Sequence, residues 1–272
     1  MNDALKYEIE RRAALAREIS RKSAEIALDF FGNAEIWNKE DSSPVTEADI
    51  AIDRQLTKEI SSNFPDDAIL SEESADTPSR LDKDFCWIID PIDGTKEFIA
   101  RRDDFCVMIG IAYKDIPVYG VINIPRTGEL FYGGENFGVN LEINNSPVKL
   151  PDVRQDGDKI LISRSHRRKI VLPYVEKKNL QAISCGSSGV KACRLVDGSA
   201  DHYLHGTTIH EWDAAAADAI IRGAGGYFRG MDSKPFSYNK PQPLIHGIIG
   251  SFNFDRVLDV SSFFANRLSF RG

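Results

Sequence analysis

The sequence predicts an α/β fold, with an α+β first half followed by an α/β second half. Three strand-like runs at 105–115, 117–125 and 128–134 are separated by turn residues, which favours an antiparallel meander. After residue 158, strand-like and helical runs alternate, and this alternation is typical of an α/β architecture. The change of pattern between the two regions predicts two structural units in one chain.

The length and composition suit either one large domain or two closely packed ones. The chain has 272 residues, and 42% of them are hydrophobic, which is enough for a large core. We expect an α+β unit over residues 1–152 and an α/β unit over residues 153–272. The soft boundary between them falls in the polar loop near 150–158.

Helical patterning opens the first half. Residues 3–31 carry apolar side chains at helical spacing. Thr46 is expected to be the N-cap of the next helix, with Asp49 completing a capping-box pattern. A short strand that ends in acidic residues is expected at 68–74, and a buried strand at 85–90.

The second half is predicted to alternate between strands and helices. The expected strands are 159–165, 180–185 and 200–206, and the expected helices are 168–178, 188–198 and 212–226. The last of these helices is rich in alanine and ends in glycines, which commonly terminate helices.

Charge and hydropathy exclude several classes of partner. The formal net charge of −7 argues against a general nucleic-acid or membrane-surface binder, which would usually carry a basic patch. A small anionic substrate is still compatible, because bound cations can reverse the local charge of a site. The charged N-terminal segment and the absence of a run long enough to span a bilayer predict a cytoplasmic protein.

The four cysteines are expected to be small buried residues with reduced thiols. No pair has the CxxC spacing, and no histidine stands at zinc-finger spacing from them. They are Cys86, Cys106, Cys185 and Cys193.

Several acidic residues stand at predicted strand ends or helix starts, close to apolar or aromatic side chains. They are Glu72, Glu73, Asp90, Asp93 and Asp213. Hard divalent cations such as Mg²⁺ prefer oxygen ligands, usually a few carboxylates with water and substrate phosphate. Carboxylates that converge from separate segments would suit two cations about 3.5–4 Å apart. The acids therefore form a candidate metal site.

The segment WIIDPIDGTKEF, residues 87–98, gives two of these acids a reason to converge. Pro91 lacks an amide N–H, so a regular strand ladder cannot continue through it. Gly94 can adopt backbone angles closed to other residues. The resulting turn could direct both acids and the Ile92 carbonyl into one pocket. Thr95 would then cap a short helix whose free N–H groups face that pocket and bind a phosphate oxygen.

An ordinary structural role is the alternative for each acid taken singly. Asp213 could be a charge at a helix start that complements the helix dipole, and Glu73 could be solvated. Spacing along the chain does not establish that the distant segments meet.

Four segments together resemble a known family, in matching order and spacing. They are SPVTEAD (43–49), SEES (71–74), WIIDPIDGTKEF (87–98) and EWDAAAADAIIRGAGG (211–226). They resemble the motifs of the inositol monophosphatase-like, lithium-sensitive phosphatases, and the resemblance covers nearly the whole chain. It implies a layered αβαβα sandwich and Mg²⁺-dependent hydrolysis of a phosphomonoester, with two or three Mg²⁺ ions per site.

The resemblance also implies roles for individual residues. Glu72, Asp90 and the carbonyl of Ile92 match positions that bind the first metal. Asp90, Asp93 and Asp213 match positions around the second. Asp49, Glu72 and Thr95 match the residues that position and activate water for attack on phosphorus.

Three segments are more similar to the 3′(2′),5′-bisphosphate nucleotidase branch than to the inositol branch. The segment DGTKEFI has Glu97 where an asparagine usually stands in the inositol branch, and 120–133 and 186–206 also resemble the nucleotidases. The implied substrate-binding residues are Asp93, Gly94, Thr95, Gly186, Ser187, Ser188, Lys191, His205 and Asp213.

The sequence departs from the nucleotidase pattern at the residues expected to bind a second phosphate. Lys191 would meet this phosphate, although a solvated helix lysine is the alternative. His205 stands where the nucleotidases tend to carry arginine, and neutral imidazole is a poorer phosphate partner than guanidinium. The basic cluster at 166–169 could compensate or could be a solvated helix start.

The function expected on these grounds is conversion of 3′-phosphoadenosine 5′-phosphate to AMP and phosphate. An inositol 1-monophosphatase or another sugar-phosphate phosphatase is the alternative, and a non-catalytic regulatory binder of the same fold is a third reading. The expected partner is a small phosphorylated substrate, a nucleotide, with neither nucleic acid nor membrane bound. The chain could form a homodimer, and the resemblance predicts sensitivity to lithium.

Overall fold

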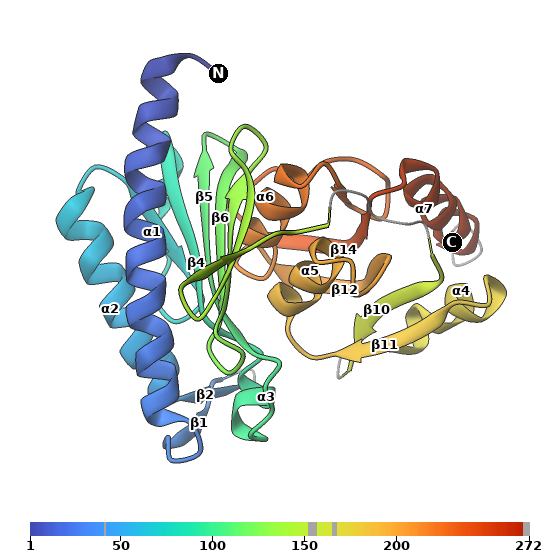
Figure 1. The fold of residues 1–272 in the computed structure, drawn as a ribbon, viewed down its shortest axis with the longest axis horizontal. Coiled ribbons are helices and arrows are strands. Elements are labelled where there is room, and N and C mark those ends of the chain that lie inside the picture. The colour runs from blue at the N-terminus through green and yellow to red at the C-terminus, as the bar shows by residue number, and fades with distance from the viewer. Residues whose placement is uncertain (41, 152–156, 165–167, 269–272) are drawn as a thin grey trace.

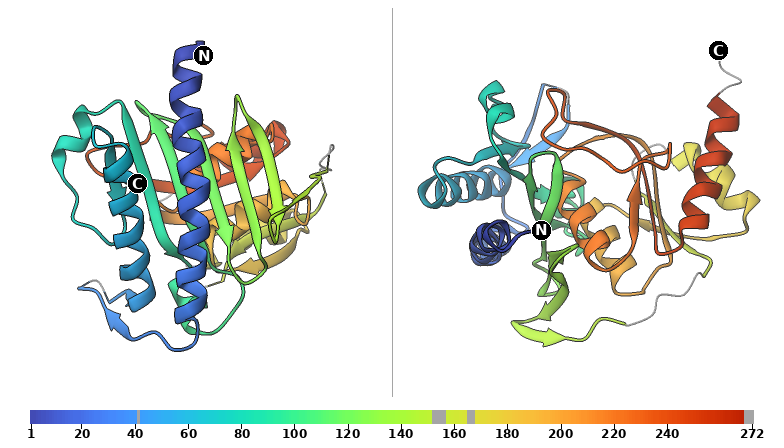
Figure 2. Two further views of the ribbon diagram at one scale, coloured as in Figure 1. Left: turned by 60° about the vertical axis from the view of Figure 1, so that its left-hand side comes forward. Right: turned by 90° about the horizontal axis from the view of Figure 1, so that it is seen from above.

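The computed structural model describes residues 1–40, 42–151, 157–164 and 168–268, and it shows five layers (Figure 1). Helices cover both outer faces, two β-sheets lie inside them, and a further pair of helices separates the sheets (Figures 1 and 2). The predicted combination of an α+β first half with an α/β second half is present in this arrangement.

The helices are α1 (Asp3–Phe30), α2 (Glu47–Asn63), α3 (Thr95–Ile99), α4 (Leu172–Lys177), α5 (Ser188–Val196), α6 (Ala215–Gly223) and α7 (Phe254–Leu268), with 3-10 turns at Pro78–Asp82 and Arg168–Ile170. A small ribbon pairs β1 (Ile36–Asn38) with β2 (Pro44–Thr46). The first large sheet contains β3 (Ala68–Ser71), β4 (Phe85–Asp93), β5 (Cys106–Tyr113), β6 (Ile116–Ile124), β7 (Glu129–Gly134), β8 (Gly138–Ile143) and β9 (Ser146–Val148). The second contains β10 (Lys159–Ser163), β11 (Gln181–Cys185), β12 (His202–His210), β13 (Tyr227–Arg229) and β14 (Leu244–Ser251).

The seven-stranded first sheet follows the chain in order from β3 to β9. Only β3 and β4 are parallel, and the predicted antiparallel meander of β5, β6 and β7 is confirmed. Helices α1 and α2 cover one face of this sheet (Figure 2). Their apolar stripes, which include the fully buried Ile9, Ile19 and Ile52, form a core with that face of the sheet.

The five-stranded second sheet has the order β11-β10-β12-β14-β13. Its β10 is parallel to both neighbours, as expected where helices connect the strands. β14 inserts antiparallel between β12 and β13, so strands distant in sequence become neighbours. Helix α7 packs on β13 and β14, on the face away from α5 and α6 (Figure 1).

Very close backbone packing fixes α6 on the first sheet. A Cβ atom at Gly120 of β6 would lie 2.4 Å from the carbonyl oxygen of Ala216, and one at Gly110 of β5 would lie 2.7 Å from the Cβ of Ala215. Only glycine on the strands and alanine on the helix allow this approach, which explains the alanine run. The loop that enters α6 is thereby held at a fixed position above β4 and β5.

Other features bear on the remaining expectations. No helix in the described part of the chain is long and apolar enough to cross a membrane. The four cysteines are buried and free of disulfides, as predicted. A division into two domains near 150–158 stays a prediction, and residues 166 and 167 of the basic cluster lie outside the described residues.

Candidate active site

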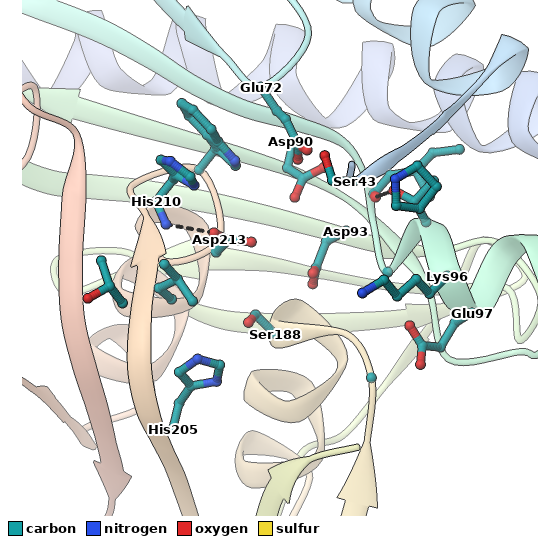
Figure 3. Close-up of a pocket in the computed structure, with 18 residues that line it drawn as sticks. Ser43, Glu72, Asp90, Asp93, Lys96, Glu97, Ser188, His205, His210 and Asp213 are labelled. Carbon is teal, nitrogen blue, oxygen red and sulfur yellow. Dashed lines mark hydrogen bonds between the residues drawn. The ribbon is translucent and has the colours of Figure 1, made fainter. Parts of the chain in front are cut away.

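A cavity of about 270 Å³ opens between the ends of the two sheets (Figure 3). Most of the predicted site residues line it, drawn from both halves of the chain. These are Glu72, Asp90, Ile92, Asp93, Gly94, Thr95, Gly186, Ser188, His205 and Asp213. Asp49, Ser187 and Lys191 do not line the cavity and lie buried in the protein.

A bulge at the end of β4 presents two acids to this cavity. Asp90 pairs with Met108 of β5, whereas Asp93 pairs with Cys106, so the register shifts between them. Pro91 lies inside the bulge, in agreement with its inability to donate a ladder hydrogen bond. Strand β4 nevertheless continues to Asp93, beyond the predicted end at residue 90. The irregular ladder therefore turns both carboxylates toward the same space (Figure 3).

Asp90, Asp93 and Asp213 form a compact group of carboxylates. Oxygens of the three side chains all lie within 4.8 Å of one another. Burial raises the pKa of each of them, and the neighbouring negative charges raise it further. The Oδ1 atom of Asp90 is buried without a hydrogen-bond partner. Three mutually repelling carboxylates, one with an unsatisfied oxygen, fit the requirements of a hard divalent cation.

Asp213 reaches the group from the loop before α6. The helix begins at Ala215, later than predicted, so Asp213 precedes it. Its carboxylate accepts a hydrogen bond of 2.8 Å from the backbone N–H of His210. This bond holds the side chain toward Asp93, and the close packing of α6 on β5 fixes the loop.

Lys39, which the sequence did not indicate, neutralises two further acids at the edge of the cavity. Its Nζ lies 2.7 Å from an oxygen of Glu72 and 2.7 Å from an oxygen of Glu73. The solvated alternative for Glu73 is wrong, because its side chain is only 8% exposed. Burial raises the pKa of Glu73 to about 7. The ammonium of Lys39 therefore lies beside Glu72, where it competes with any metal cation that this carboxylate would bind.

Lys39→Met is expected to raise the affinity of the site for Mg²⁺ by roughly 3- to 10-fold, because a competing positive charge beside Glu72 is removed. Isothermal titration of the metal-free protein with Mg²⁺ measures the change. Lys58→Met, at an exposed position of α2, is the control and should leave the affinity unchanged. An unchanged or lower affinity of the Lys39 variant would show that Lys39 does not compete for the carboxylates.

Asp49 and Thr95 contact each other. The predicted capping box is confirmed: Asp49 accepts bonds from the Thr46 N–H (2.8 Å) and hydroxyl (2.5 Å). The Thr95 hydroxyl lies 3.4 Å from the other Asp49 oxygen and 3.2 Å from the carbonyl of Ile92. Burial raises the pKa of Asp49 to about 6. This pair combines a hydroxyl with a carboxylate that titrates near neutral pH.

The expected capping role of Thr95 is wrong. Gly94, with φ at +97°, occupies the N-cap of α3, and Thr95 is the first helical residue. The helix ends at Ile99 and is short, as predicted. The left-handed conformation at Gly94 frees the threonine hydroxyl to contact Asp49.

Lys191 is buried, and the solvated alternative is wrong. Its side chain has no exposed surface, and its Nζ donates to the carbonyls of Ser187 (2.7 Å) and Gly186 (3.0 Å). The Ser187 hydroxyl and the Gly189 N–H each donate to the same oxygen of Asp93 at 2.6 Å. Lys191 therefore supports the loop that holds Asp93, and its ammonium is directed to backbone oxygens.

His205 lines the lower part of the cavity from β12 (Figure 3). It is 3% exposed, and its Nε2 lies 2.8 Å from the hydroxyl of Thr207. The register of β12 against β14 shifts between His205 and Thr208, which bends the strand at the cavity. The structure thus places this imidazole at the site, opposite the acidic residues.

Two residues near the site, Lys39 and Arg164, carried no sequence signal. Arg164, directly after β10, pairs with Glu97 and Asp104, which belong to the first half of the chain. Charged residues that directly follow a strand are common in loops. The spacing of Lys39 and Arg164 therefore does not distinguish these side chains from solvent-exposed ones.

Comparison with known proteins agrees with this geometry. The family model described as the inositol monophosphatase family matches residues 8–257. The 3′(2′),5′-bisphosphate nucleotidase CysQ of Aggregatibacter actinomycetemcomitans is 31% identical, over 88% of this chain and 94% of that protein. The histidinol-phosphatase of Chlorobaculum parvum is 30% identical, over 86% of this chain and 88% of that protein.

Solved structures show the same fold. CysQ from Bacteroides thetaiotaomicron superposes with a TM-score of 0.74 at 30% identity, covering 89% of this chain and 97% of that one. The inositol monophosphatase from Anabaena superposes with a TM-score of 0.77 at 23% identity, covering 95% of this chain and 97% of that one. The predicted αβαβα sandwich is confirmed, and the chain belongs to the inositol monophosphatase family.

Proposed function

We propose that the chain is a Mg²⁺-dependent 3′(2′),5′-bisphosphate nucleotidase that converts 3′-phosphoadenosine 5′-phosphate to AMP and phosphate. The observation that carries the proposal is the convergence of Asp90, Asp93 and Asp213 in one cavity shared by both sheets. Two relatives named as 3′(2′),5′-bisphosphate nucleotidases, which are 31% and 30% identical to this chain, support the choice of substrate.

The residues that would hold two or three Mg²⁺ ions are Glu72, Asp90, the carbonyl of Ile92, Asp93 and Asp213. When bound, Mg²⁺ lowers the pKa of water and neutralises charge on phosphoryl oxygens. The three clustered carboxylates would hold ions beside the phosphate, and the Gly94 turn would let the backbone approach it.

Proton transfer would fall to Asp49 and Thr95, with Glu72 helping to orient the water. The Thr95 hydroxyl, 3.4 Å from Asp49, would orient the attacking water, and the carboxylate of Asp49 would take up its proton. The hydrogen bonds from Thr46 keep one Asp49 oxygen occupied, so the other faces Thr95. The contact between Thr95 and Asp49 would thereby both orient the attacking water and provide the acceptor for its proton.

At saturating Mg²⁺, the rate of the wild-type protein is expected to fall as the pH is lowered below about 6, the pKa of Asp49 before a cation binds. The carboxylate of Asp49 must be ionised to accept a proton, so activity is present above its pKa and is lost below it. A bound cation lowers this pKa and therefore shifts the acidic limb of the pH–rate profile to lower pH. Asp49→Asn should lower the rate about 10²-fold, and its residual rate should lack the acidic limb. An unchanged limb in the variant would assign the titration to another group.

A second candidate is hydrolysis of a substrate with a single phosphate, such as inositol 1-phosphate or another sugar phosphate. His205, in the position expected for an arginine, favours this candidate because imidazole is a weaker phosphate ligand. Lys191, whose ammonium is directed to backbone carbonyls, points the same way. A regulatory binder without catalysis is less well supported, since every proposed ligand position carries a suitable oxygen.

A substrate panel with Mg²⁺ tests the proposal. Phosphate release from 3′-phosphoadenosine 5′-phosphate should exceed that from inositol 1-phosphate, histidinol phosphate and fructose 1,6-bisphosphate, and millimolar lithium should inhibit it. Turnover of a single-phosphate substrate alone would overturn the nucleotidase assignment. A homodimer and a cytoplasmic location stay predictions.

A further inference from the structure

Arg164 connects the two halves of the chain beside the cavity. Arg164 follows β10 in the second sheet, and its backbone N–H donates to the carbonyl of Cys185 at 3.1 Å. Its guanidinium crosses to the first half, where Nη1 lies 2.8 Å from an oxygen of Glu97 and Nη2 lies 2.8 Å from an oxygen of Asp104. The planar guanidinium can serve two carboxylates at once, which an ammonium cannot do with the same geometry.

We propose that Arg164 is a positioning residue for substrate binding: it neutralises Glu97 and Asp104 beside the cavity and holds segment 186–188 in place. The proposal rests on the proposed function only in requiring that the cavity binds a phosphate ester.

The position of Glu97 shows how closely this arrangement is packed. Glu97 is 5% exposed and lines the cavity. A Cβ atom at Gly186 would lie 1.9 Å from the carboxyl carbon of Glu97, so the carboxylate is in contact with the glycine backbone. Arg164 fixes one Glu97 oxygen, and this determines how far the carboxylate extends over Gly186.

Asp104 carries the effect to the backbone of the loop. The carboxylate oxygen that contacts Arg164 also accepts a 3.0 Å bond from the N–H of Gly186. The next residue, Ser187, donates to Asp93 at 2.6 Å. The loop is thereby anchored at one end to the Arg164 pair and at the other to a proposed metal ligand.

Charge makes Arg164 more than a structural link. Without it, the buried carboxylate of Glu97 and the partly buried carboxylate of Asp104 would carry uncompensated charge near a cavity that receives an anionic ester. Like charges at short range in a poorly solvated site repel strongly. Binding of the substrate should suffer more than the chemical step, because neither carboxylate lies among the proposed catalytic residues.

Steady-state kinetics of Arg164 variants test this. Arg164→Met is expected to raise KM for the best phosphomonoester of the panel by about 10- to 100-fold, with a smaller fall in kcat. Arg164→Lys should restore part of the loss, since it returns the charge without the two-pronged geometry. Arg164→Met combined with Glu97→Gln and Asp104→Asn should bring KM back toward the wild-type value.

The last variant separates the proposal from a merely structural role. If Arg164 only stabilised the fold, removing two more of its partners would leave KM as high as in the single variant or higher. That result, or an unchanged KM in Arg164→Met, would overturn the proposal. Arg126→Met is the matched control, because Arg126 forms an exposed 2.9 Å ion pair with the neighbouring Asp103.

Binding of inorganic phosphate in the presence of Mg²⁺, followed by calorimetry, is a readout independent of the substrate. Its affinity should fall in Arg164→Met and recover in the triple variant, even if the protein does not cleave a nucleotide. Should Arg164→Met fail to fold, the Arg164→Lys variant decides: a several-fold loss of phosphate affinity supports the proposal, and no loss overturns it.

Discussion

Asp90→Asn is expected to lower kcat/KM about 10³-fold or more in the presence of Mg²⁺. Asp90 lies at the centre of the carboxylate group, is 1% exposed, and has one oxygen without a hydrogen-bond partner. Asparagine preserves the size of the side chain but removes the charge that would bind the cation. Without metal, the variant should be more stable than the wild type, because repulsion with the other carboxylates is relieved.

Thermal unfolding with and without Mg²⁺ measures the second effect alongside the kinetics. Asp218→Asn is a matched control, since Asp218 is also buried and also has one oxygen without a hydrogen-bond partner. Asp218 does not line the cavity, and its other oxygen accepts a 3.0 Å hydrogen bond from the hydroxyl of Tyr238. The control should keep its turnover and its stabilisation by Mg²⁺. Normal Mg²⁺-dependent turnover of Asp90→Asn would remove Asp90 from the proposed ligands.

Lys191→Met is expected to lower the free energy of unfolding by about 3 kcal/mol, since the buried ammonium bonds to backbone carbonyls that would lose their partner. Activity should fall as well, because the same loop holds Asp93 through Ser187 and Gly189. Urea unfolding followed by fluorescence gives the stability difference.

Lys58→Met, on the exposed face of α2, provides the control for loss of a helical lysine and should change the stability by less than about 0.5 kcal/mol. Equal effects of the two substitutions would contradict the buried role of Lys191. A large loss of bisphosphate turnover at unchanged stability would instead support a direct contact of Lys191 with substrate.

The acidic cluster was predictable because local chemistry marks it. Pro91 and Gly94 impose an irregular strand end, and a bulge between Asp90 and Asp93 follows from those constraints. That Asp213 meets these acids followed only from the family resemblance, because spacing carries no information about distant contacts. The close packing of the α6 alanines could not be predicted, because the glycines of β5 and β6 that accept them lie far away in sequence.

Other parts of the fold and the site could not be predicted from the local sequence. The burial of Lys191 against backbone carbonyls could not be predicted, because which face of a helix is buried depends on tertiary packing. Lys39 and Arg164 lie outside the regular elements, next to polar loops that have no periodicity. The insertion of β14 between β12 and β13 likewise depends on pairing between distant segments, which the local pattern does not encode.

The contact between Gly186 and Glu97 also constrains how the sequence can change in evolution. Because a Cβ atom at 186 would lie 1.9 Å from the Glu97 carboxyl carbon, a side chain at 186 is compatible only with a shorter or redirected residue at 97. The two positions therefore form an epistatic pair: glycine must be in place before the glutamate can be acquired, and the glutamate then makes the glycine difficult to lose. A change of substrate through residue 97 would have to pass through this order of substitutions.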